Sequence, residues 1–264
     1  MRILLTGNKG FVGRNIEQEL TNDGHTIIGF EAERHFDNWL DRLHKLPDFD
    51  AVIHAGAIAK NQFDNPSIFL WNSYATLNLA RYTHRGIPFI FFSTFQVSMT
   101  EKDLRQRSWY GWSKAFAEEC LHEVIPNATI LRPGVMWGDE KHKGDPTDRS
   151  VPYLLATHQL KYLYRNWGRD YVHISDVVRA VKEALRNTPQ GTFNLNSEYW
   201  SNEELAELTE WKGYEMIGDP AKKLGIQFNT PVPKSTADGQ PSLPNWEPQA
   251  CLKTEFQKIE NGIY

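Results

Sequence analysis

Short apolar runs alternate with amphipathic stretches along most of this 264-residue chain. The amphipathic stretches have the spacing of helices and cover residues 11–20, 67–85, 109–124, 151–160 and 176–186. The apolar runs have the length of strands and cover residues 3–5, 26–30, 51–54, 89–92, 129–131 and 192–195. Strands that are apolar on both faces and separated by helices are typical of a parallel sheet between two helical layers. The pattern therefore predicts a doubly wound α/β fold.

The alternation loosens after about residue 138, where a polar loop covers residues 141–146. Ser201 and Glu204 have the spacing of a capping box. The stretch 230–248 contains five prolines and is expected to be loop. We expect a nucleotide-binding domain over residues 1–140, to which residues 170–196 return, and a small, discontinuous substrate-binding region made of residues 141–169 and 197–264.

The charge balance and the cysteines narrow the set of partners. The chain has 29 Lys and Arg against 33 Asp and Glu, a net charge of −4, so it lacks the basic surface that binds nucleic acid or anionic membranes. Cys120 and Cys251 are far apart and have no CxxC partner, which argues against a disulfide framework or a zinc site. No stretch approaches the roughly 18 apolar residues of a membrane span, and the N-terminal apolar run is too short for a signal peptide. We expect a cytoplasmic protein without metal, membrane or nucleic acid among its partners.

Three glycines follow the first predicted strand and lead into the first predicted helix. In this context the first glycine permits a tight turn, the second lets the backbone approach a pyrophosphate, and the third lets helix and strand pack closely. The helix N-terminus adds amide donors for the phosphates. The loop therefore predicts a bound dinucleotide, held by Gly7, Asn8, Lys9, Gly10, Phe11, Val12 and Gly13.

Glu31 ends the second predicted strand, where a carboxylate can accept hydrogen bonds from the adenosine ribose hydroxyls. A carboxylate there repels the 2′-phosphate of NADP, so Glu31 favours NAD. Arg34, three residues further on, keeps NADP open. The plainer alternative is that Glu31 is a solvated charge at a strand end.

A hydroxyl, a phenol and an amine follow in an order that suits proton transfer. Tyr110 and Lys114 are four residues apart in a predicted helix and so share one face. A neighbouring ammonium and a positively charged nicotinamide favour the phenolate, which lets Tyr110 carry a proton to or from a sugar hydroxyl. This spacing alone is common by chance. Thr94, however, closes the preceding strand at the edge where ligands of open α/β sheets bind, and its hydroxyl can bond the reacting oxygen.

Together these motifs resemble those of the extended short-chain dehydrogenases/reductases, in particular the NAD-dependent epimerase/dehydratase family, whose members act mainly on nucleotide sugars. The resemblance covers about residues 1–200. It rests on several independent motifs in the family's order: TGNKGFVG at 6–13, Glu31, HAGAIA at 54–59, Asn72, FFST at 91–94, YGWSK at 110–114, LRPGVMWG at 131–138 and RDYVHISD at 169–176.

The resemblance implies NAD bound across the glycine loop of a Rossmann-like sheet, with Thr94, Tyr110 and Lys114 as the catalytic triad and Lys114 also bonding the nicotinamide ribose. It implies further cofactor contacts at Ala55, Gly56, Ala57, Asn72 and Pro133. Family members often dimerise through the helices that here hold residues 72–85 and 110–124, which implies a homodimer.

The resemblance also implies substrate contacts. Arg169 matches the arginine that contacts the diphosphate of sugar nucleotides, a role that suits a guanidinium fork. The alternative for Arg169 is a structural salt bridge with Asp170 or Asp176. Thr94 and Gln96 are the other candidate substrate contacts.

Several positions depart from the family's patterns. The dehydratases of the family carry Asp-Glu after the triad hydroxyl, whereas this chain has Phe95 and Gln96, which argues against dehydration. Gln96 also replaces the cysteine of the 3,5-epimerase/reductases. Ser98 and Gly134 replace an aromatic residue and an asparagine of the family, so the contacts to substrate phosphates are expected to differ.

The motifs favour an NAD-dependent nucleotide-sugar epimerase that oxidises a sugar hydroxyl transiently and reduces it again. The close alternative is an NAD(P)H-dependent reductase of a keto-sugar or another carbonyl compound. A third interpretation, a dinucleotide-sensing protein without catalysis, does not explain why hydroxyl, tyrosine and lysine are kept in register. His54 and His173 lie in or beside apolar strands and are expected to be core histidines, and His142 is given no role.

Overall fold

The computed structural model describes residues 1–31, 41–59, 67–83, 86–97, 109–141, 143, 149–218 and 241–263. Its contacts divide the chain into two compact units. The first is made of Met1–Pro133, Val178–Leu195 and Ala237–Trp246, and the second of Gly134–Val177, Asn196–Thr236 and Glu247–Tyr264. Arg34, Ser98 and His142 lie outside the described residues.

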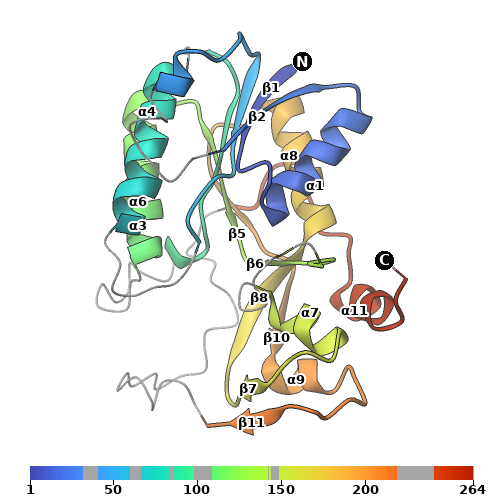
Figure 1. The fold of residues 1–264 in the computed structure, drawn as a ribbon. Helices are drawn as coiled ribbons and strands as arrows, with labels where there is room; N and C mark the ends of the chain where they lie inside the picture. Colours follow the sequence, from blue (N-terminus) through green and yellow to red (C-terminus); the bar gives the residue numbers. More distant parts are fainter. Residues whose placement is uncertain are drawn as a thin grey trace. The chain divides into compact units, whose positions relative to one another are not determined.

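The first unit is built on a parallel sheet of six strands. The strands lie in the order β2-β1-β3-β4-β5-β9, and neighbouring strands all pair in parallel. Figure 1 shows β1, β2 and β5 of this sheet. Their bounds are β1 Arg2–Thr6, β2 Thr26–Phe30, β3 Ala51–His54, β4 Phe89–Phe92, β5 Thr129–Pro133 and β9 Gly191–Leu195. All six lie where the apolar runs predict strands, so the Rossmann-like fold is confirmed.

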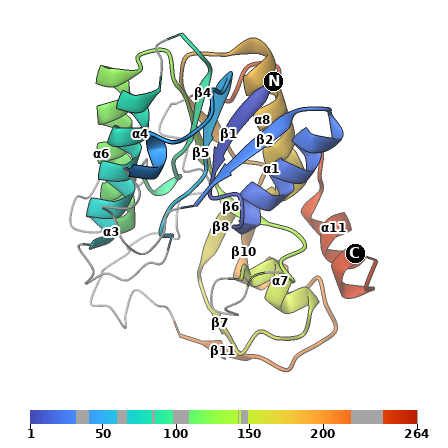
Figure 2. The ribbon, with the colours of Figure 1, turned by 45° about the horizontal axis from the view of Figure 1, so that its top comes forward.

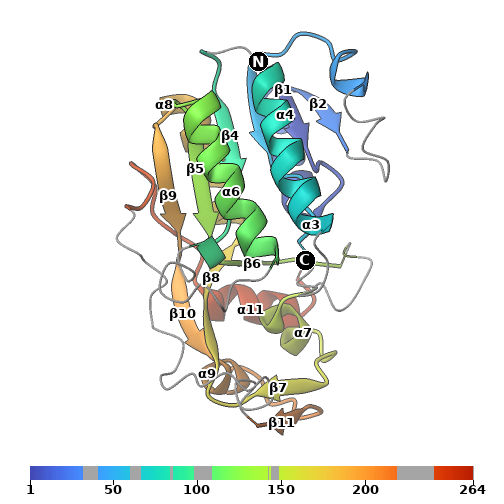
Figure 3. The same ribbon diagram turned by 90° about the vertical axis from the view of Figure 1, so that its left-hand side faces the viewer.

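Helices cover both faces of this sheet. Helix α1 (Phe11–Asn22) and α8 (Ile174–Asn187) lie on one face (Figure 2). The other face is covered by α4 (Ala75–Tyr82) and α6 (Trp109–Val124), which run side by side (Figure 3). Between these two helices and the strands lies an apolar core that includes Leu4, Val52, Phe91, Leu79 and Leu121.

The strand order reverses between β1 and β3, because β2 follows β1 to one side and the later strands continue to the other. In open parallel sheets a ligand binds at the carboxyl ends of the strands beside such a reversal. The glycine loop follows β1 and residues 55–57 follow β3. The topology therefore brings these predicted cofactor-binding segments to the reversal point.

The helix predicted over residues 67–85 is interrupted. Helix α3 (Ser67–Phe69) is followed by a π-helical turn, η1 (Leu70–Tyr74), and only then by α4. Such turns often occur at functional sites. Here the turn contains Asn72, one of the residues for which the sequence predicts a cofactor contact.

The second unit is a small mixed structure. Strands β6 (Val135–Trp137), β8 (Gly168–His173) and β10 (Glu198–Ser201) form one sheet, and β7 (Tyr162–Tyr164) pairs with β11 (Glu215–Ile217). Helices α7 (Val151–Ala156), α9 (Asn202–Ala206) and α11 (Leu252–Glu260) complete the unit. The predicted capping box is present, because Ser201 and Glu204 bond reciprocally at the start of α9. Within the described residues no helix is long and apolar enough to cross a membrane.

Candidate active site

The loop after β1 is so tightly packed that only glycine fits at two of its positions. Gly7 has φ +73°, and a Cβ on it would lie 2.7 Å from Cα of Gly56 in the loop after β3. A Cβ on Gly13 would lie 2.1 Å from the carbonyl oxygen of Gly7. The amide of Gly10 donates to that same oxygen, at 3.0 Å, and closes the turn. The glycines thus allow three backbone segments to meet.

This loop fits a dinucleotide phosphate. Helix α1 begins directly after Gly10, whose lack of a side chain leaves the helix without a side-chain cap. The N-terminus of a 12-residue helix therefore faces the loop with its amide donors and positive dipole end. Oδ1 of Asn8 is buried and has no hydrogen-bond partner among the described residues. An amide oxygen left in this way suits a ligand that brings a hydroxyl or amide donor.

Glu31 is held at the tip of β2. Its carboxylate accepts a 2.7 Å hydrogen bond from the backbone amide of Lys9, and its carbonyl accepts one from Arg42. The carboxylate therefore lies against the glycine loop. Donation by Lys9 uses only part of the carboxylate's capacity as an acceptor, so ribose hydroxyls can be bound as well.

Asn72 braces two segments of the first unit. Its Oδ1 accepts from the amide of Ile58 (2.9 Å), and its Nδ2 donates to the carbonyl of Ile58 (3.2 Å) and to Oγ of Ser113 (3.0 Å). The loop that begins with Ala55 and Ala57 is thereby fixed against α6. The predicted contact of Asn72 with the cofactor stays a prediction, since its amide already serves protein groups.

The structure brings together the three residues predicted to act on the substrate. Thr94 follows β4 and is 5% exposed, and its side chain forms a hydrogen bond with that of Tyr110 near the start of α6. Nζ of Lys114, one helical turn later, lies 6.0 Å from the centre of the Tyr110 ring. The same Nζ donates to the carbonyl of Phe92 at 2.7 Å. A hydroxyl, a phenol and an amine therefore share one end of the sheet.

Burial shifts the pKa of both titratable members of this group. It raises the pKa of Tyr110 to about 12, although the hydrogen bond from Thr94 opposes the shift. It lowers the pKa of Lys114 to about 7, although the charge of Glu118 opposes this. The protein alone thus holds Tyr110 as the neutral phenol at neutral pH, and a bound positive charge is needed to favour the phenolate.

Two predicted residues adjoin this group. The carbonyl of Pro133, the last residue of β5, accepts a 3.1 Å hydrogen bond from the amide of Phe95. The amide of Gln96 donates to Oγ1 of Thr94 at 3.3 Å. Pro133 and Gln96 are therefore tied to the segment that carries the Thr94 hydroxyl.

His54 is a core histidine, as expected. Its ring is 3% exposed. Nδ1 is 2.6 Å from Oγ1 of Thr6 and Nε2 is 2.9 Å from Oγ1 of Thr76. Because the Thr76 hydroxyl donates to the carbonyl of Asn72, it accepts from Nε2, and His54 is a neutral ring with both nitrogens bonded. His173, in the second unit, is also buried; its Nδ1 lies 2.8 Å from Oγ of Ser175.

Arg169 lies on β8 in the second unit. Its guanidinium carbon is 4.1 Å from the centre of the Trp167 ring, and Nη1 donates to the carbonyl of Gly168. Burial lowers the pKa of Arg169 to about 10, which leaves it charged. The carboxylate of Asp176 accepts instead from the amides of Gln249 and Ala250. Arg169 is thus a stacked, oriented cation.

Close packing explains why position 134 is a glycine. A Cβ there would lie 2.6 Å from the carbonyl oxygen of Asp170 and 3.1 Å from Oδ1 of Asn196. The backbone of β8 therefore approaches too closely for the asparagine that the family often has here. Oδ1 of Asn196 lies next to this position, and no sequence motif indicated that it would.

Sequence reasoning missed a buried ion pair next to the predicted triad. Glu118 and Arg132 are 3% and 6% exposed and are joined by two hydrogen bonds. The available signal was the position of Glu118, four residues after Lys114 and on the same face of α6. Nothing in the sequence pattern placed Arg132 beside it.

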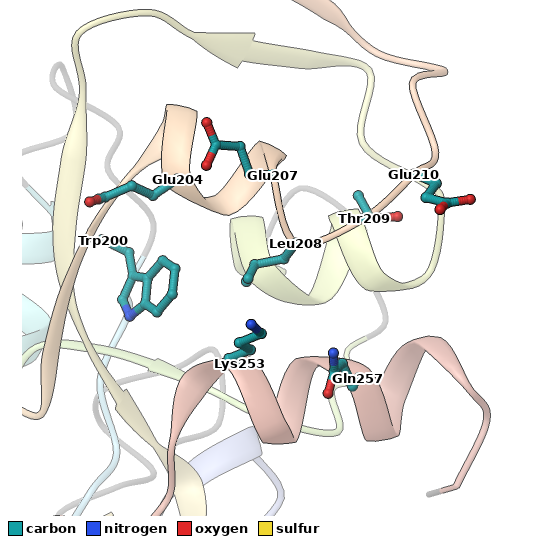
Figure 4. Close-up of a pocket in the computed structure, with 8 residues that line it drawn as sticks. All are labelled: Trp200, Glu204, Glu207, Leu208, Thr209, Glu210, Lys253 and Gln257. Carbon is teal, nitrogen blue, oxygen red and sulfur yellow. The ribbon is translucent and has the colours of Figure 1, made fainter.

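A cavity of about 540 Å³ lies within the second unit (Figure 4). Trp200 and the segment from α9 onward line one side of it, and Lys253 and Gln257 of α11 line the other. The lining residues from α9 onward are Glu204, Glu207, Leu208, Thr209 and Glu210. None of the predicted site residues lines this cavity.

Comparison with known proteins identifies the same family. The model of the "NAD dependent epimerase/dehydratase family" matches residues 3–195. Pal from Bacillus thuringiensis is 20% identical with a TM-score of 0.77, and the match covers 100% of this chain and 99% of that one. The ADP-L-glycero-D-manno-heptose-6-epimerase of Helicobacter pylori is 22% identical with a TM-score of 0.75, covering 99% and 96%. The UDP-glucuronic acid 4-epimerase of Bacillus cereus, solved with UDP-glucuronic acid and NAD, is 19% identical with a TM-score of 0.72, covering 100% of both chains.

The two kinds of match support different statements. Structural likeness at these identities shows the shared fold. The family match spans well over half of the sequence and includes the glycine loop, Tyr110 and Lys114. The chain therefore belongs to the NAD-dependent epimerase/dehydratase family, as an enzyme of the extended short-chain dehydrogenase/reductase type whose cofactor is NAD.

Proposed function

We propose that this protein is an NAD-dependent nucleotide-sugar epimerase that transiently oxidises a sugar hydroxyl and then reduces it again. The observation that carries the proposal is the convergence of Thr94, Tyr110 and Lys114. They meet at the same edge of the parallel sheet as the glycine loop. A protein that only sensed a dinucleotide would need no such group.

The three residues have distinct roles in this proposal. Thr94 binds the reacting oxygen of the sugar, and Tyr110 removes the hydroxyl proton and later returns it. Lys114 favours the phenolate form of Tyr110 and bonds the nicotinamide ribose. NAD, when bound, supplies reversible hydride acceptance at its nicotinamide ring. Gly7 to Gly13, Ala55, Gly56, Ala57, Asn72 and Pro133 are the residues proposed to hold it.

The substrate contacts are proposed from chemistry. A guanidinium stacked on an indole keeps its outward N–H groups oriented, which suits bidentate binding of a diphosphate. Arg169 near Trp167 has this form, and Gln96 is tied to Thr94 through its backbone amide. We assign Arg169 to the diphosphate and Gln96 to the sugar.

The function is tested by native mass spectrometry of the purified protein, alone and with a panel of nucleotide sugars. We expect NAD to be retained and one nucleotide sugar to bind and to be converted to its epimer without net consumption of NAD. Binding of added NADPH to an empty protein, with reduction of a keto-sugar, would favour the reductase instead. Binding of NAD without any nucleotide sugar would contradict both the substrate class and the roles of Arg169 and Gln96.

Glu31 is proposed to select NAD over NADP. We expect Glu31→Ser to shift the ratio of NADP to NAD affinity toward NADP, because the substitution removes the charge that repels a 2′-phosphate. The affinities are measured by titration with each cofactor. Glu17→Ser is the matched control, since this carboxylate bonds Nδ2 of Asn8 but does not end β2. An unchanged ratio in Glu31→Ser would mean that Glu31 is only a surface charge.

We also propose a cytoplasmic homodimer. Cys120 and Cys251 are both free thiols, as fits a reducing compartment. Phe116 on α6 is 48% exposed, and its ring lies 5.4 Å from that of Phe69 on α3. Tyr74 and Trp109 on the same group of helices are also exposed. A second copy of this chain would cover this aromatic surface, and the native mass spectrum of the protein reads the oligomeric state directly.

A further inference from the structure

The carboxylate of Glu118 is buried, and both of its oxygens accept hydrogen bonds. It lies on α6, one turn after Lys114, and is 3% exposed. Nε of Arg132 donates to Oε1 at 3.0 Å and Nη2 donates to Oε2 at 2.6 Å, and the hydroxyl of Ser93 also donates to Oε1. A charge-assisted bidentate pair of this kind fixes both partners in orientation.

This single carboxylate joins the three segments that carry the proposed site. Ser93 directly precedes Thr94 at the end of β4. Arg132 directly precedes Pro133 at the end of β5. Glu118 itself follows Tyr110 and Lys114 on α6. The ends of two neighbouring strands are thus held against the helix at the level of the triad.

A gain in folding stability does not by itself explain why the Glu118–Arg132 ion pair is buried here. A buried ion pair loses so much hydration that well-packed apolar residues of similar size often serve a fold equally well. Glu118 does, however, place a fixed negative charge one helical turn from Lys114, whose amine is buried. Glu118 is the group whose charge raises the pKa of Lys114 against the effect of burial.

Among the described residues, the other groups that face Lys114 supply no negative charge at neutral pH. The carbonyl of Phe92 accepts from Nζ, and the ring of Phe91 lies 4.5 Å from it. His54 on β3 is neutral, since burial and the charge of Lys114 lower its pKa to about 3. Burial keeps Tyr110 a phenol, and Arg132, which is paired with Glu118, is a cation.

We propose that Glu118, held by Arg132 and Ser93, is a positioning residue that increases the fraction of Lys114 in its ammonium form and fixes α6 against the ends of β4 and β5. Glu118 contacts neither substrate nor cofactor in this role. It acts through Lys114, which in turn favours the phenolate of Tyr110. The inference rests on the proposed function for its catalytic meaning, whereas its effect on Lys114 is measured without any turnover.

The test follows the ionisation of Lys114 by NMR in the full-length protein labelled with ¹³C at lysine Cε, the signal being assigned by its loss in Lys114→Met. We expect Glu118→Gln, which keeps the shape but removes the charge, to lower the pKa of Lys114. The ratio of ammonium to amine at fixed pH should fall about tenfold or more. Glu118→Asp, which keeps the charge but shortens the side chain, should retain most of the ammonium. If Glu118 had only a structural role, Glu118→Asp would change the Lys114 titration more than Glu118→Gln does.

Three further variants complete the test. Glu183→Gln is the matched control, because Glu183 is another buried glutamate paired with an arginine, Arg186, but lies on α8; it should leave the Lys114 titration unchanged. If Glu118→Gln fails to fold because Arg132 is left unpaired, the double variant Glu118→Gln/Arg132→Gln is compared with Arg132→Gln, from which it differs only in the charge of Glu118. The pKa of Lys114 should be lower in the double variant than in Arg132→Gln.

The possible outcomes separate this inference from the proposed function. An unchanged Lys114 titration in Glu118→Gln, or the same titration in the double variant as in Arg132→Gln, would overturn the role of Glu118. A wild-type protein that converts no nucleotide sugar would overturn the proposed function, while the titration of Lys114 would still decide whether Glu118 sets its charge.

Discussion

Tyr110→Phe is expected to lower turnover of the nucleotide sugar by about 10²–10⁴-fold, the usual contribution of a positioned acid or base. The substitution removes only the phenol oxygen, which forms the hydrogen bond with Thr94. Binding of NAD should stay nearly unchanged, because the glycine loop and Glu31 do not depend on this hydroxyl. Epimer formation is measured by chromatography, and NAD retention by native mass spectrometry of the same sample.

The control for this substitution is Tyr82→Phe. Tyr82 lies at the end of α4, where its ring contacts His44 and Phe49. Tyr82→Phe removes a phenol oxygen from the same unit but not from the site, and it should leave turnover unchanged. Turnover in Tyr110→Phe equal to that of the wild type would remove Tyr110 from the mechanism.

Acid is expected to destabilise the protein through His54. Burial lowers the pKa of His54 from 6.5 to about 3. Between these two values the unfolded chain binds a proton that the folded protein does not. The contribution of neutral His54 to stability is therefore fully present above pH 6.5 and is lost as the pH falls toward 3. At about pH 4.5 the loss should reach about 2–3 kcal/mol.

The measurement is urea unfolding of the wild type and of His54→Asn at about pH 7 and about pH 4.5. An asparagine can still accept from Thr6 and donate to Thr76, but it does not titrate. We expect the variant to be less stable at both pH values and to lose about 2–3 kcal/mol less than the wild type on acidification. His122→Asn, at an exposed position of α6, controls for the loss of a histidine. The same acid loss in His54→Asn and wild type would assign it to other groups.

Most of the sheet of the first unit could be predicted from sequence because its central strands are buried on both faces. Residues 51–54 and 89–92 are fully buried, and these two runs and residues 26–30 at the edge of the sheet match the observed strands at both ends. The second unit lacks this signal. Strands β6, β7 and β11 have only three residues each, too few for a period to be recognised, and β8 carries Arg169 and Asp170 within it.

The residues of the candidate site also differ in how well the sequence predicts them. Residues fixed by local backbone geometry, such as Gly7 and Gly13, are evident from their spacing before a helix. Residues that are held by partners distant in sequence cannot be recognised from such spacing. Arg132 meets Glu118 only because β5 lies next to β4 beneath α6. The π-helical turn around Asn72 likewise leaves no pattern in the apolar positions of residues 67–85.

The discontinuity of the first unit has a consequence for how the chain folds as it is synthesised. Strand β5 ends at Pro133, but its outer neighbour β9 begins only at Gly191. Until the ribosome has passed that point, the hydrogen-bonding edge of β5 has no partner strand. An unpaired apolar edge in a growing chain invites pairing with another molecule. The nascent protein is therefore exposed to such pairing while residues 134–190 are being made.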